Sequence, residues 1–167
     1  MNPFEILKGI DIFSSLSDRE LERIKTVARE ESFPEGTVIF NENAPGDKLY
    51  IIGEGHIDIK KRGEDGRSLV GLVRLGPGEI IGELSILDEK PRSASAFAAG
   101  PSKTVLLSIG KSDLDRILDQ DQALAVKLLR GMLRKLSARL RLADEALAIL
   151  AKMDMVLERV RRRNPPP

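Results

Sequence analysis

The sequence has 167 residues, of which 41% are apolar and 32% charged, with one histidine and neither cysteine nor tryptophan. This length suits one domain with an appendage, and the lack of cysteine excludes disulfide bonds and thiolate metal sites. Charged residues at Glu5, Lys8 and Asp11 interrupt the apolar N-terminus, which excludes a signal peptide and a membrane span there. We therefore expect a cytoplasmic protein.

The net charge of +1 conceals an uneven distribution. Residues 1–120 hold 16 basic and 21 acidic side chains, a net charge of −5, whereas residues 121–167 hold 11 basic and 5 acidic ones, a net charge of +6. The basic segment could dock on its own acidic domain, remain solvated, or meet an acidic partner or nucleic acid.

The N-terminal part is predicted to be helical. Apolar residues recur every third position from Leu7 to Leu16, which indicates a short helix or helical turns. Ser17 and Glu20 have the spacing of a capping box, so we expect a helix from about Asp18 to Glu31. Its buried face would consist of Leu21, Ile24, Val27 and Ala28.

From residue 34 the apolar period changes to about two. Short apolar or β-branched runs occupy residues 37–40, 48–52, 55–60, 68–73 and 104–109, and glycine- or proline-containing turns separate them. Short, regularly spaced strands of this kind are typical of antiparallel barrels and jelly rolls. The sequence therefore predicts an α+β fold, an antiparallel β jelly-roll barrel with N-terminal helices and a long C-terminal helix.

That long helix is predicted to begin at Asp121 or Gln122, after a short helix from Ser112 to about Leu118. Neither glycine nor proline occurs at residues 132–164, and three prolines follow. We expect residues 1–120 to form the domain, residues 121–163 the long helix and residues 164–167 a disordered tail.

The long helix can be arranged in heptads, in which only Asp154 is polar among ten seam positions. The a positions are Val126, Leu133, Leu140, Leu147 and Asp154, and the d positions are Leu129, Leu136, Ala143, Leu150 and Leu157. This pattern predicts a coiled-coil homodimer. A second apolar stripe begins at Leu142 and continues through Ala146, Ile149, Met153, Val156 and Val160. More than two helices, a partner protein or another part of the same subunit could cover it.

The stretch at residues 78–94 offers chemistry suited to one phosphate and one sugar. Gly82 permits a close backbone approach, and a short helix at residues 83–88 would present unpaired N–H groups to an anion. Arg92 has paired donors that fit two phosphate oxygens, and Ser93 adds a hydroxyl. Glu83 repels a phosphate but accepts hydrogen bonds from a ribose hydroxyl. A structural ion pair between Glu83 and Arg92 is the alternative.

The run GEIIGELSILDEKPRSA at residues 78–94 resembles the phosphate-binding cassette of cyclic nucleotide-binding domains, the family of the catabolite activator protein and of protein kinase A regulatory subunits. The similarity extends upstream through FSSLS at residues 13–17, GTVIF at 36–40 and LYIIGEG at 49–55. By this resemblance, Arg92 would bind the cyclic phosphate, assisted by Ser93 and the backbone near Leu84 and Ser85. Gly82 would admit the ligand, and Glu83 would accept the ribose 2′-hydroxyl.

The resemblance also implies a base pocket. Ile59, Leu72 and Ala94 align with positions that line the nucleotide in relatives, although apolar inward positions equally fill an ordinary barrel core. Lys135 and Arg139 fall on the face of the long helix that could cap the base, or they could be solvated charges. Ser93 favours cAMP over cGMP as the ligand.

We therefore expect a regulatory module that binds a cyclic mononucleotide and signals through its dimeric C-terminal helix to an unknown downstream protein. No helix-turn-helix follows the domain, so we expect no specific DNA binding. The alternative is an oligomeric scaffold with the same fold that is unliganded or binds cGMP or a cyclic dinucleotide. An enzyme is not expected, because His56 is isolated and a thiol nucleophile is absent.

Overall fold

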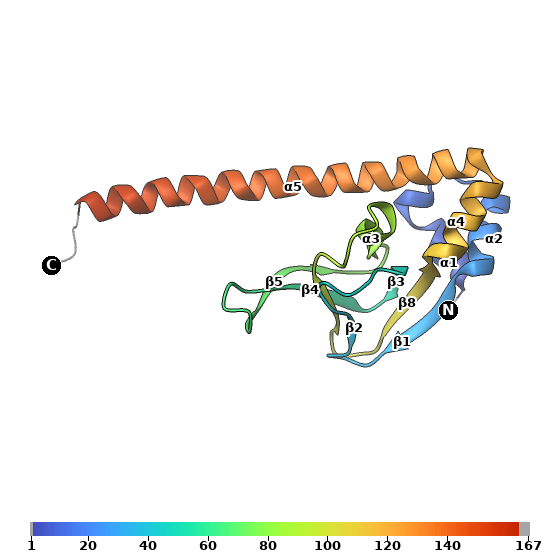
Figure 1. Cartoon of the computed structure of the whole chain (residues 1–167), viewed down its shortest axis with the longest axis horizontal. Coiled ribbons are helices and arrows are strands. Elements are labelled where there is room, and N and C mark those ends of the chain that lie inside the picture. The colour runs from blue at the N-terminus through green and yellow to red at the C-terminus, as the bar shows by residue number, and fades with distance from the viewer. Residues whose placement is uncertain (1, 164–167) are drawn as a thin grey trace.

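The computed structural model describes residues 2–163, in which two β-sheets face each other, short helices cover one end and one long helix crosses the rim (Figure 1). The helices are α1 (Pro3–Lys8), the 3-10 helix η1 (Asp11–Phe13), α2 (Asp18–Val27), α3 (Glu83–Leu87), α4 (Lys111–Gln120) and α5 (Gln122–Arg163). The strands are β1 (Arg29–Phe33), β2 (Val38–Phe40), β3 (Lys48–Glu54), β4 (His56–Arg62), β5 (Leu69–Leu75), β6 (Ile80–Ile81), β7 (Ser95–Ala99) and β8 (Thr104–Gly110). The predicted tail at residues 164–167 lies outside the described residues.

The strands form two four-stranded sheets, with the orders β1-β8-β3-β6 and β2-β7-β4-β5, and every pairing is antiparallel. One core cluster of buried residues combines strands of both sheets and consists of Tyr50, Ile52, Ile57, Ile81, Ala96 and Leu106. Strands with alternate inward side chains produce such a core when two sheets stack. The predicted jelly-roll fold, with N-terminal helices and a long C-terminal helix, is confirmed.

A second core cluster joins the helices to the outer face of the sheet that contains β8. It includes Leu7, Ile12, Leu21, Ile24, Leu107 and Ile109. The first part of α5 belongs to this cluster as well, because Leu124, Leu128 and Met132 are each at most 2% exposed. Apolar packing therefore anchors the N-terminal part of α5 to the domain.

The predicted helix from Asp18 to Glu31 is too long. Helix α2 ends at Val27, Ala28 adopts an extended backbone, and Arg29–Phe33 forms the strand β1, which pairs with β8. Backbone hydrogen bonds to a central strand outweigh the helical preference of this charged segment. Val27 and Ala28 are accordingly half-buried rather than buried. The sequence reading also omitted β6 and β7, the latter because its alanines carry little strand signal.

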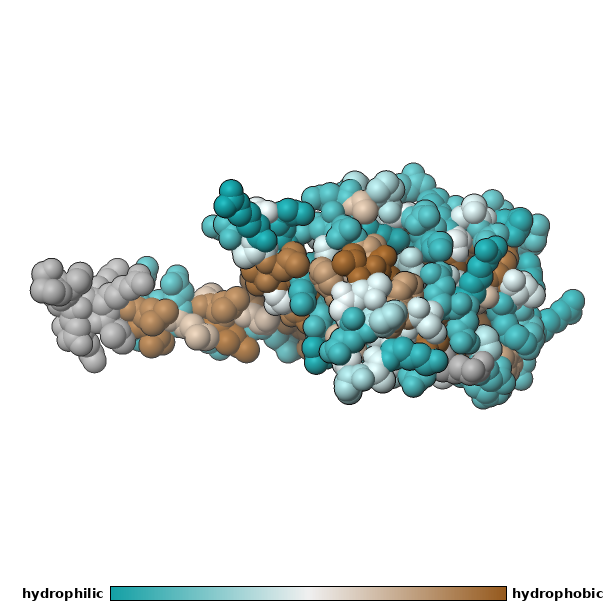
Figure 2. Space-filling model, turned by 90° about the horizontal axis from the view of Figure 1, so that it is seen from below, coloured by the Kyte–Doolittle hydropathy of each residue, from teal (hydrophilic) through white to brown (hydrophobic). Residues whose placement is uncertain are grey.

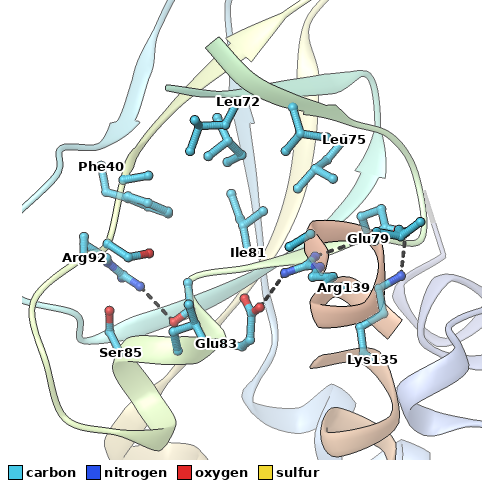
Figure 3. A pocket seen from close by; sticks show the side chains of 18 of the residues that line it. Phe40, Leu72, Leu75, Glu79, Ile81, Glu83, Ser85, Arg92, Lys135 and Arg139 are labelled. Carbon is cyan, nitrogen blue, oxygen red and sulfur yellow. Dashed lines mark hydrogen bonds and ion pairs between the residues drawn. The ribbon is translucent and has the colours of Figure 1, made fainter. Parts of the chain in front are cut away.

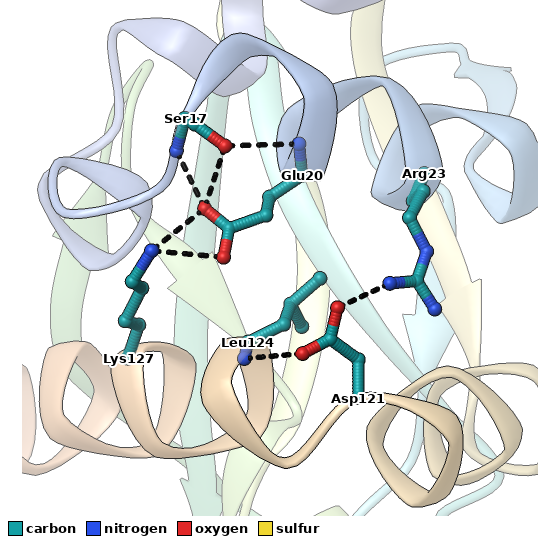
Figure 4. Close-up of polar contacts among 6 residues, drawn as sticks. All are labelled: Ser17, Glu20, Arg23, Asp121, Leu124 and Lys127. Atoms are coloured by element: carbon teal, nitrogen blue, oxygen red, sulfur yellow. Dashed lines mark hydrogen bonds and ion pairs between the residues drawn. The ribbon is translucent and has the colours of Figure 1, made fainter.

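Two polar clusters set the direction of α5 against α2 (Figure 4). The predicted capping box is present, since the Ser17 hydroxyl accepts from the backbone N–H of Glu20 and the Glu20 carboxylate accepts from the backbone N–H of Ser17. Both Glu20 oxygens also accept from Lys127 of α5, at 2.9 Å. Asp121 accepts from the backbone N–H of Leu124, which caps α5, and pairs with Arg23 of α2.

The second half of α5 extends past the β4–β5 hairpin and beyond the domain (Figure 1). All residues from Leu140 to Arg159 are exposed, and apolar side chains are visible on the projecting part (Figure 2). The seam residues are exposed by 49 to 64% at Val126, Leu133, Leu140, Leu147 and Leu150. Among the described residues, no helix combines the length and apolarity needed to cross a bilayer.

Candidate functional site

A cavity of about 570 Å³ lies between the β-roll, the short helix α3 and the middle of α5 (Figure 3). Every residue that the sequence singled out for the site lines this cavity. They are Ile59, Leu72, Gly82, Glu83, Leu84, Ser85, Arg92, Ser93, Ala94, Lys135 and Arg139. The structure thus brings together residues from β4, β5, the cassette at residues 78–94, and α5.

Arg92 is 2% exposed and donates its hydrogen bonds to backbone oxygens, while the carboxylate of Asp47 lies at the longer distance of 3.9 Å from Nη2. Its Nη1 donates to the carbonyl oxygen of Gly82 at 3.0 Å, and its Nη2 donates to that of Lys48 at 2.7 Å. The guanidinium lies over the ring of Phe40, 4.3 Å from the centroid. Burial lowers the pKa of Arg92. Its Nε is buried without a hydrogen-bond partner, so the guanidinium retains donor capacity.

The sharp turn before α3 makes the arginine contact possible. Gly82 adopts a left-handed backbone with φ of 78°, and a Cβ at this position would lie 2.3 Å from Nη1 of Arg92 and 3.1 Å from the carbonyl oxygen of Lys48. The left-handed backbone therefore favours glycine, and a Cβ here would also force the Arg92 guanidinium to move from its position beside Gly82.

Ser85 is buried against the loop that precedes β3, whereas Ser93 is exposed at the rim. A Cβ at Gly46 of that loop would lie 2.1 Å from Cβ of Ser85. The close approach of Gly46 fixes the distance between this loop and α3.

Glu83, the first residue of α3, is 2% exposed, and its Oε1 accepts from Nη1 of Arg139 at 2.5 Å. The described contacts do not include the alternative, an ion pair between Glu83 and Arg92. The basic partner of Glu83 is Arg139, which belongs to α5. Burial raises the pKa of Glu83, and the positive charge of Arg139 opposes that shift.

Glu79 connects the cassette to α5, and the sequence reading gave it no role. Its carboxylate accepts from Nζ of Lys135 at 2.5 Å and from Nη2 of Arg139 at 3.2 Å. Burial favours its neutral form, but these two basic partners outweigh burial and lower the pKa of Glu79. Nη2 of Arg139 also donates to the carbonyl oxygen of Ile80 at 2.6 Å. Lys135 and Arg139 are therefore not solvated charges.

The remaining wall is mostly apolar. Ala94 is buried and Ile59 is half-buried, but Leu72 is 56% exposed, so Leu72 is not a residue of the barrel core. The sequence reading also missed Phe40 as a wall residue, although it lies in one of the motifs that carried the resemblance. Leu142 of α5 also lines the cavity and completes its wall. The sequence pattern that could have indicated this part of the wall is the second apolar stripe, which begins at Leu142.

Comparison with known proteins agrees with this geometry. The family model described as "Cyclic nucleotide-binding domain" matches residues 30–121. A relative from Mycobacterium tuberculosis, named CRP-like cAMP-activated global transcriptional regulator, is 34% identical over 132 residues, which are 79% of this chain and 58% of the relative. The chain thus spans less than two thirds of the length of that regulator.

Solved structures show the same fold. The N-terminal domain of a transcriptional regulator from Streptomyces coelicolor is 33% identical, with a TM-score of 0.69, and the match covers 80% of this chain and 94% of that one. A cyclic nucleotide-binding domain from Methylobacillus flagellatus is 29% identical, with a TM-score of 0.75, and the match covers 90% and 82% of the two chains. This chain belongs to the cyclic nucleotide-binding domain family.

Proposed function

We propose that the protein is a cyclic-nucleotide sensor that binds one cyclic mononucleotide, cAMP, in the cavity between the β-roll, α3 and α5. The observation that carries this proposal is the placement of a buried guanidinium with spare donor capacity and a buried carboxylate in one apolar cavity. A cavity of about 570 Å³ is within the usual range for small-molecule sites.

Each part of the ligand has a chemically suitable neighbour. The phosphate would bind Arg92 with help from Ser93 and from the backbone of α3 at Leu84 and Ser85. The ribose 2′-hydroxyl would donate to Glu83, and Gly82 would allow the close approach. The base would lie against the apolar wall formed by Ile59, Leu72 and Ala94, with Lys135 and Arg139 closing the side toward α5.

The choice of cAMP over cGMP rests on two supports. Ser93 follows the phosphate-binding arginine, and the M. tuberculosis relative is named as cAMP-activated. Because that relative is longer than this chain, its activity as a transcriptional regulator is not transferred here. The proposed role is binding and regulation in the cytoplasm rather than catalysis, and His56 does not line the cavity.

The proposed output is a dimer formed by α5. Residues 1–120 would bind the ligand, and residues 121–163 would pair with a second copy along the heptad seam. Leu133, Leu140 and Leu147, which occupy successive a positions, are each more than 60% exposed, and this supports the proposal. A water-exposed row of seam leucines is stabilised by packing against a second helix. On the domain side, Leu84 and Leu87 of α3 are 41% and 39% exposed and could pack inward when ligand binds.

Calorimetric titration tests the proposal. We expect the wild type to bind one cAMP per chain, and Arg92→Ala to weaken binding about 100-fold, because a bidentate charge-assisted contact is lost. Arg67→Ala, which removes an exposed arginine outside the cavity, is the matched control and should bind as the wild type does.

Other outcomes would support other functions. Binding of cGMP or a cyclic dinucleotide in preference to cAMP would overturn the ligand assignment. No heat with any of them would favour the oligomeric scaffold. Conversion of cAMP to AMP during incubation would establish an enzyme instead.

A further inference from the structure

The ring of Phe40 lies against the guanidinium of Arg92, the group that would bind the phosphate (Figure 3). Cζ of Arg92 is 4.3 Å from the centroid of the ring, within the roughly 6 Å over which a cation and an aromatic face attract each other. Phe40 also lines the cavity, and the ring of Tyr50 lies 6.0 Å from it, centroid to centroid. The fold thus places an aromatic face beside the buried cation.

A cation as buried as Arg92 needs compensation for its charge. Its side chain is 2% exposed, and burial without compensation disfavours the charged form. The carboxylate of Asp47 is 3.9 Å away on a side chain that is 81% exposed, so water screens its attraction. The carbonyl oxygens of Gly82 and Lys48 supply part of the compensation. The π face of Phe40 supplies a further attraction.

An aromatic ring compensates this charge differently from a carboxylate. A carboxylate would accept hydrogen bonds from the guanidinium and would repel a phosphate. The ring attracts the cation through its negative face and leaves the in-plane N–H groups free. Within the described part of the chain, Nε of Arg92 is buried without a hydrogen-bond partner. Phe40 therefore stabilises the charge and keeps donors available to an anion.

Backbone hydrogen bonds hold the ring and the arginine together. Phe40 is the last residue of β2 and pairs with Ala96 of β7. In the loop that follows, the backbone N–H of Asn43 donates to the carbonyl oxygen of Arg92 at 2.9 Å. The backbone N–H of Arg92 in turn donates to the carbonyl oxygen of Ala44, also at 2.9 Å. The contact between the ring and the guanidinium is therefore supported by the backbone on both sides.

We infer that Phe40 is a positioning residue for the phosphate: its ring holds the guanidinium of Arg92 in place as a cation whose remaining donors are available to the ligand. This inference rests on the proposed function and deepens it. The ring adds no charge of its own, so the positive charge of Arg92 is left to match the single negative charge of a cyclic phosphodiester. Phe40 thus strengthens phosphate binding through Arg92.

A double-mutant cycle separates this role from a direct contact between Phe40 and the ligand. We expect Phe40→Leu, which keeps an apolar side chain but removes the ring, to weaken cAMP binding about 5- to 10-fold in calorimetric titration, since a desolvated cation–π contact is lost. In the Arg92→Ala background the same substitution should change the affinity by less than about 2-fold, because the partner of the ring is already missing. Phe40→Tyr, which keeps the ring, should retain most of the wild-type affinity.

Phe33→Leu is the matched control. Phe33 is half-buried and packs against the same core cluster as Phe40, but it does not line the cavity. Loss of this ring should leave the affinity for cAMP unchanged, and circular dichroism checks that both variants fold. A similar loss of affinity in both variants would reflect core packing in general and would overturn the inference.

The two phosphorothioate diastereomers of cAMP report on the orientation of the guanidinium. In each of them sulfur, a weak hydrogen-bond acceptor, replaces one of the two exocyclic phosphate oxygens. A guanidinium held in one orientation should bind the two analogues with affinities that differ about 10-fold. Phe40→Leu should reduce this ratio to about 3-fold, whereas Phe33→Leu should preserve it. The ratio does not depend on the fraction of protein that is folded, so it remains informative for a destabilised variant.

The outcomes are distinct. If Phe40→Leu weakens binding equally in the wild-type and Arg92→Ala backgrounds, Phe40 contacts the ligand directly and the inference is wrong. If Phe40→Leu weakens both phosphorothioates equally, the ring does not orient the guanidinium, which also overturns it. If the wild type binds no cyclic nucleotide at all, the proposed function fails and this inference fails with it. Binding that depends on Arg92 but not on Phe40 overturns the inference alone.

Discussion

Gly131 of α5 lies directly against the carbonyl group of Ile12 in η1, and a Cβ at Gly131 would be 2.1 Å from that oxygen. An alanine in a helix interior is normally more stable than glycine, by about 1 kcal/mol. Here the neighbour is backbone, which cannot rotate away as a flexible side chain would. The close crossing of η1 and α5 therefore depends on the absence of one methyl group.

Gly131→Ala is expected to destabilise the protein by about 2 kcal/mol, because overpacking outweighs the gain in helix propensity. Urea unfolding followed by circular dichroism measures the effect. The control is Ser137→Ala at an exposed position of the same helix, which should be neutral or slightly stabilising. A more stable Gly131→Ala would show that η1 and α5 do not touch in this way.

Gly82→Ala should impair the cavity more than it impairs the fold. The new methyl group would lie 2.3 Å from Nη1 of Arg92. The alanine would also have to adopt a backbone φ of 78°, which is unfavourable for a residue with a side chain. We expect a loss of cAMP affinity of about 10-fold or more, with a stability loss of about 1–2 kcal/mol. Gly66→Ala is matched to it, since Gly66 has a φ of 65° with open space around its missing Cβ. That variant should lose stability without losing affinity, and equal losses of affinity in both would contradict the steric argument.

Acid should weaken the junction between α2 and α5 through Glu20. Hydrogen bonds from Lys127 and then from the backbone and hydroxyl of Ser17 lower the pKa of Glu20 to about 2. Because the folded pKa is below the unfolded value, the stabilisation is fully present above about pH 4.5 and is lost as the pH falls toward 2. After allowance for the partial exposure of Lys127, this amounts to on the order of 1–2 kcal/mol.

Glu20→Gln removes this titrating group and provides the comparison. The free energy of unfolding of the variant should be lower than that of the wild type at pH 7, and the difference should shrink between pH 5 and pH 2. Other carboxylates titrate in both proteins, so only the difference between the two curves is diagnostic. A difference that is constant over this range would show that Glu20 is not ionised in the junction.

Leu147→Asp should disrupt the proposed dimer without affecting the domain. Leu147 is a seam residue that is 64% exposed in the single chain, and a charge there would be buried between two helices. Light scattering should show monomers at micromolar concentration, while cAMP binding per chain persists. Met155→Asp is the control, because Met155 is similarly exposed, at 56%, but belongs to neither apolar stripe.

The second stripe distinguishes a dimer from a larger assembly. Ile149, which is 58% exposed, belongs to that stripe and not to the seam. If α5 forms only a two-stranded coil, Ile149→Asp should remain dimeric. If four helices pack together, this substitution should reduce the tetramer to a dimer.

The fold and the site were predictable to different degrees. The jelly roll followed from the turn-punctuated runs, because glycine, proline and the Ser17–Glu20 spacing act locally on the backbone. Seven of the eleven candidate residues lie in the cassette, and the other four followed only from the resemblance, namely Ile59, Leu72, Lys135 and Arg139. Strand β1 could not be predicted in this way. Its residues Arg29–Phe33 are mostly polar, and they are strand only because β8 offers them a partner that is 70 to 80 residues distant in the sequence.

The orientation of the α5 side chains was likewise beyond the sequence. The resemblance placed Lys135 and Arg139 on the face of the long helix that borders the cavity, but it did not distinguish a base from a carboxylate as the partner of Arg139. Glu79 was missed because a single glutamate beside a glycine turn has no pattern of its own. Its role depends on two residues that follow it by 56 and 60 positions.

The length of α5 beyond the cavity has a mechanical consequence. From Arg139 to Arg159 the helix runs for about 30 Å, and all its residues after Arg139 are exposed, so a rotation of only about 10° at the cavity rim would move Arg159 sideways by about 5 Å. That displacement is close to the rise of one helical turn. A change of one hydrogen bond at Glu83 could therefore be amplified into a different alignment of side chains at the far end of the helix.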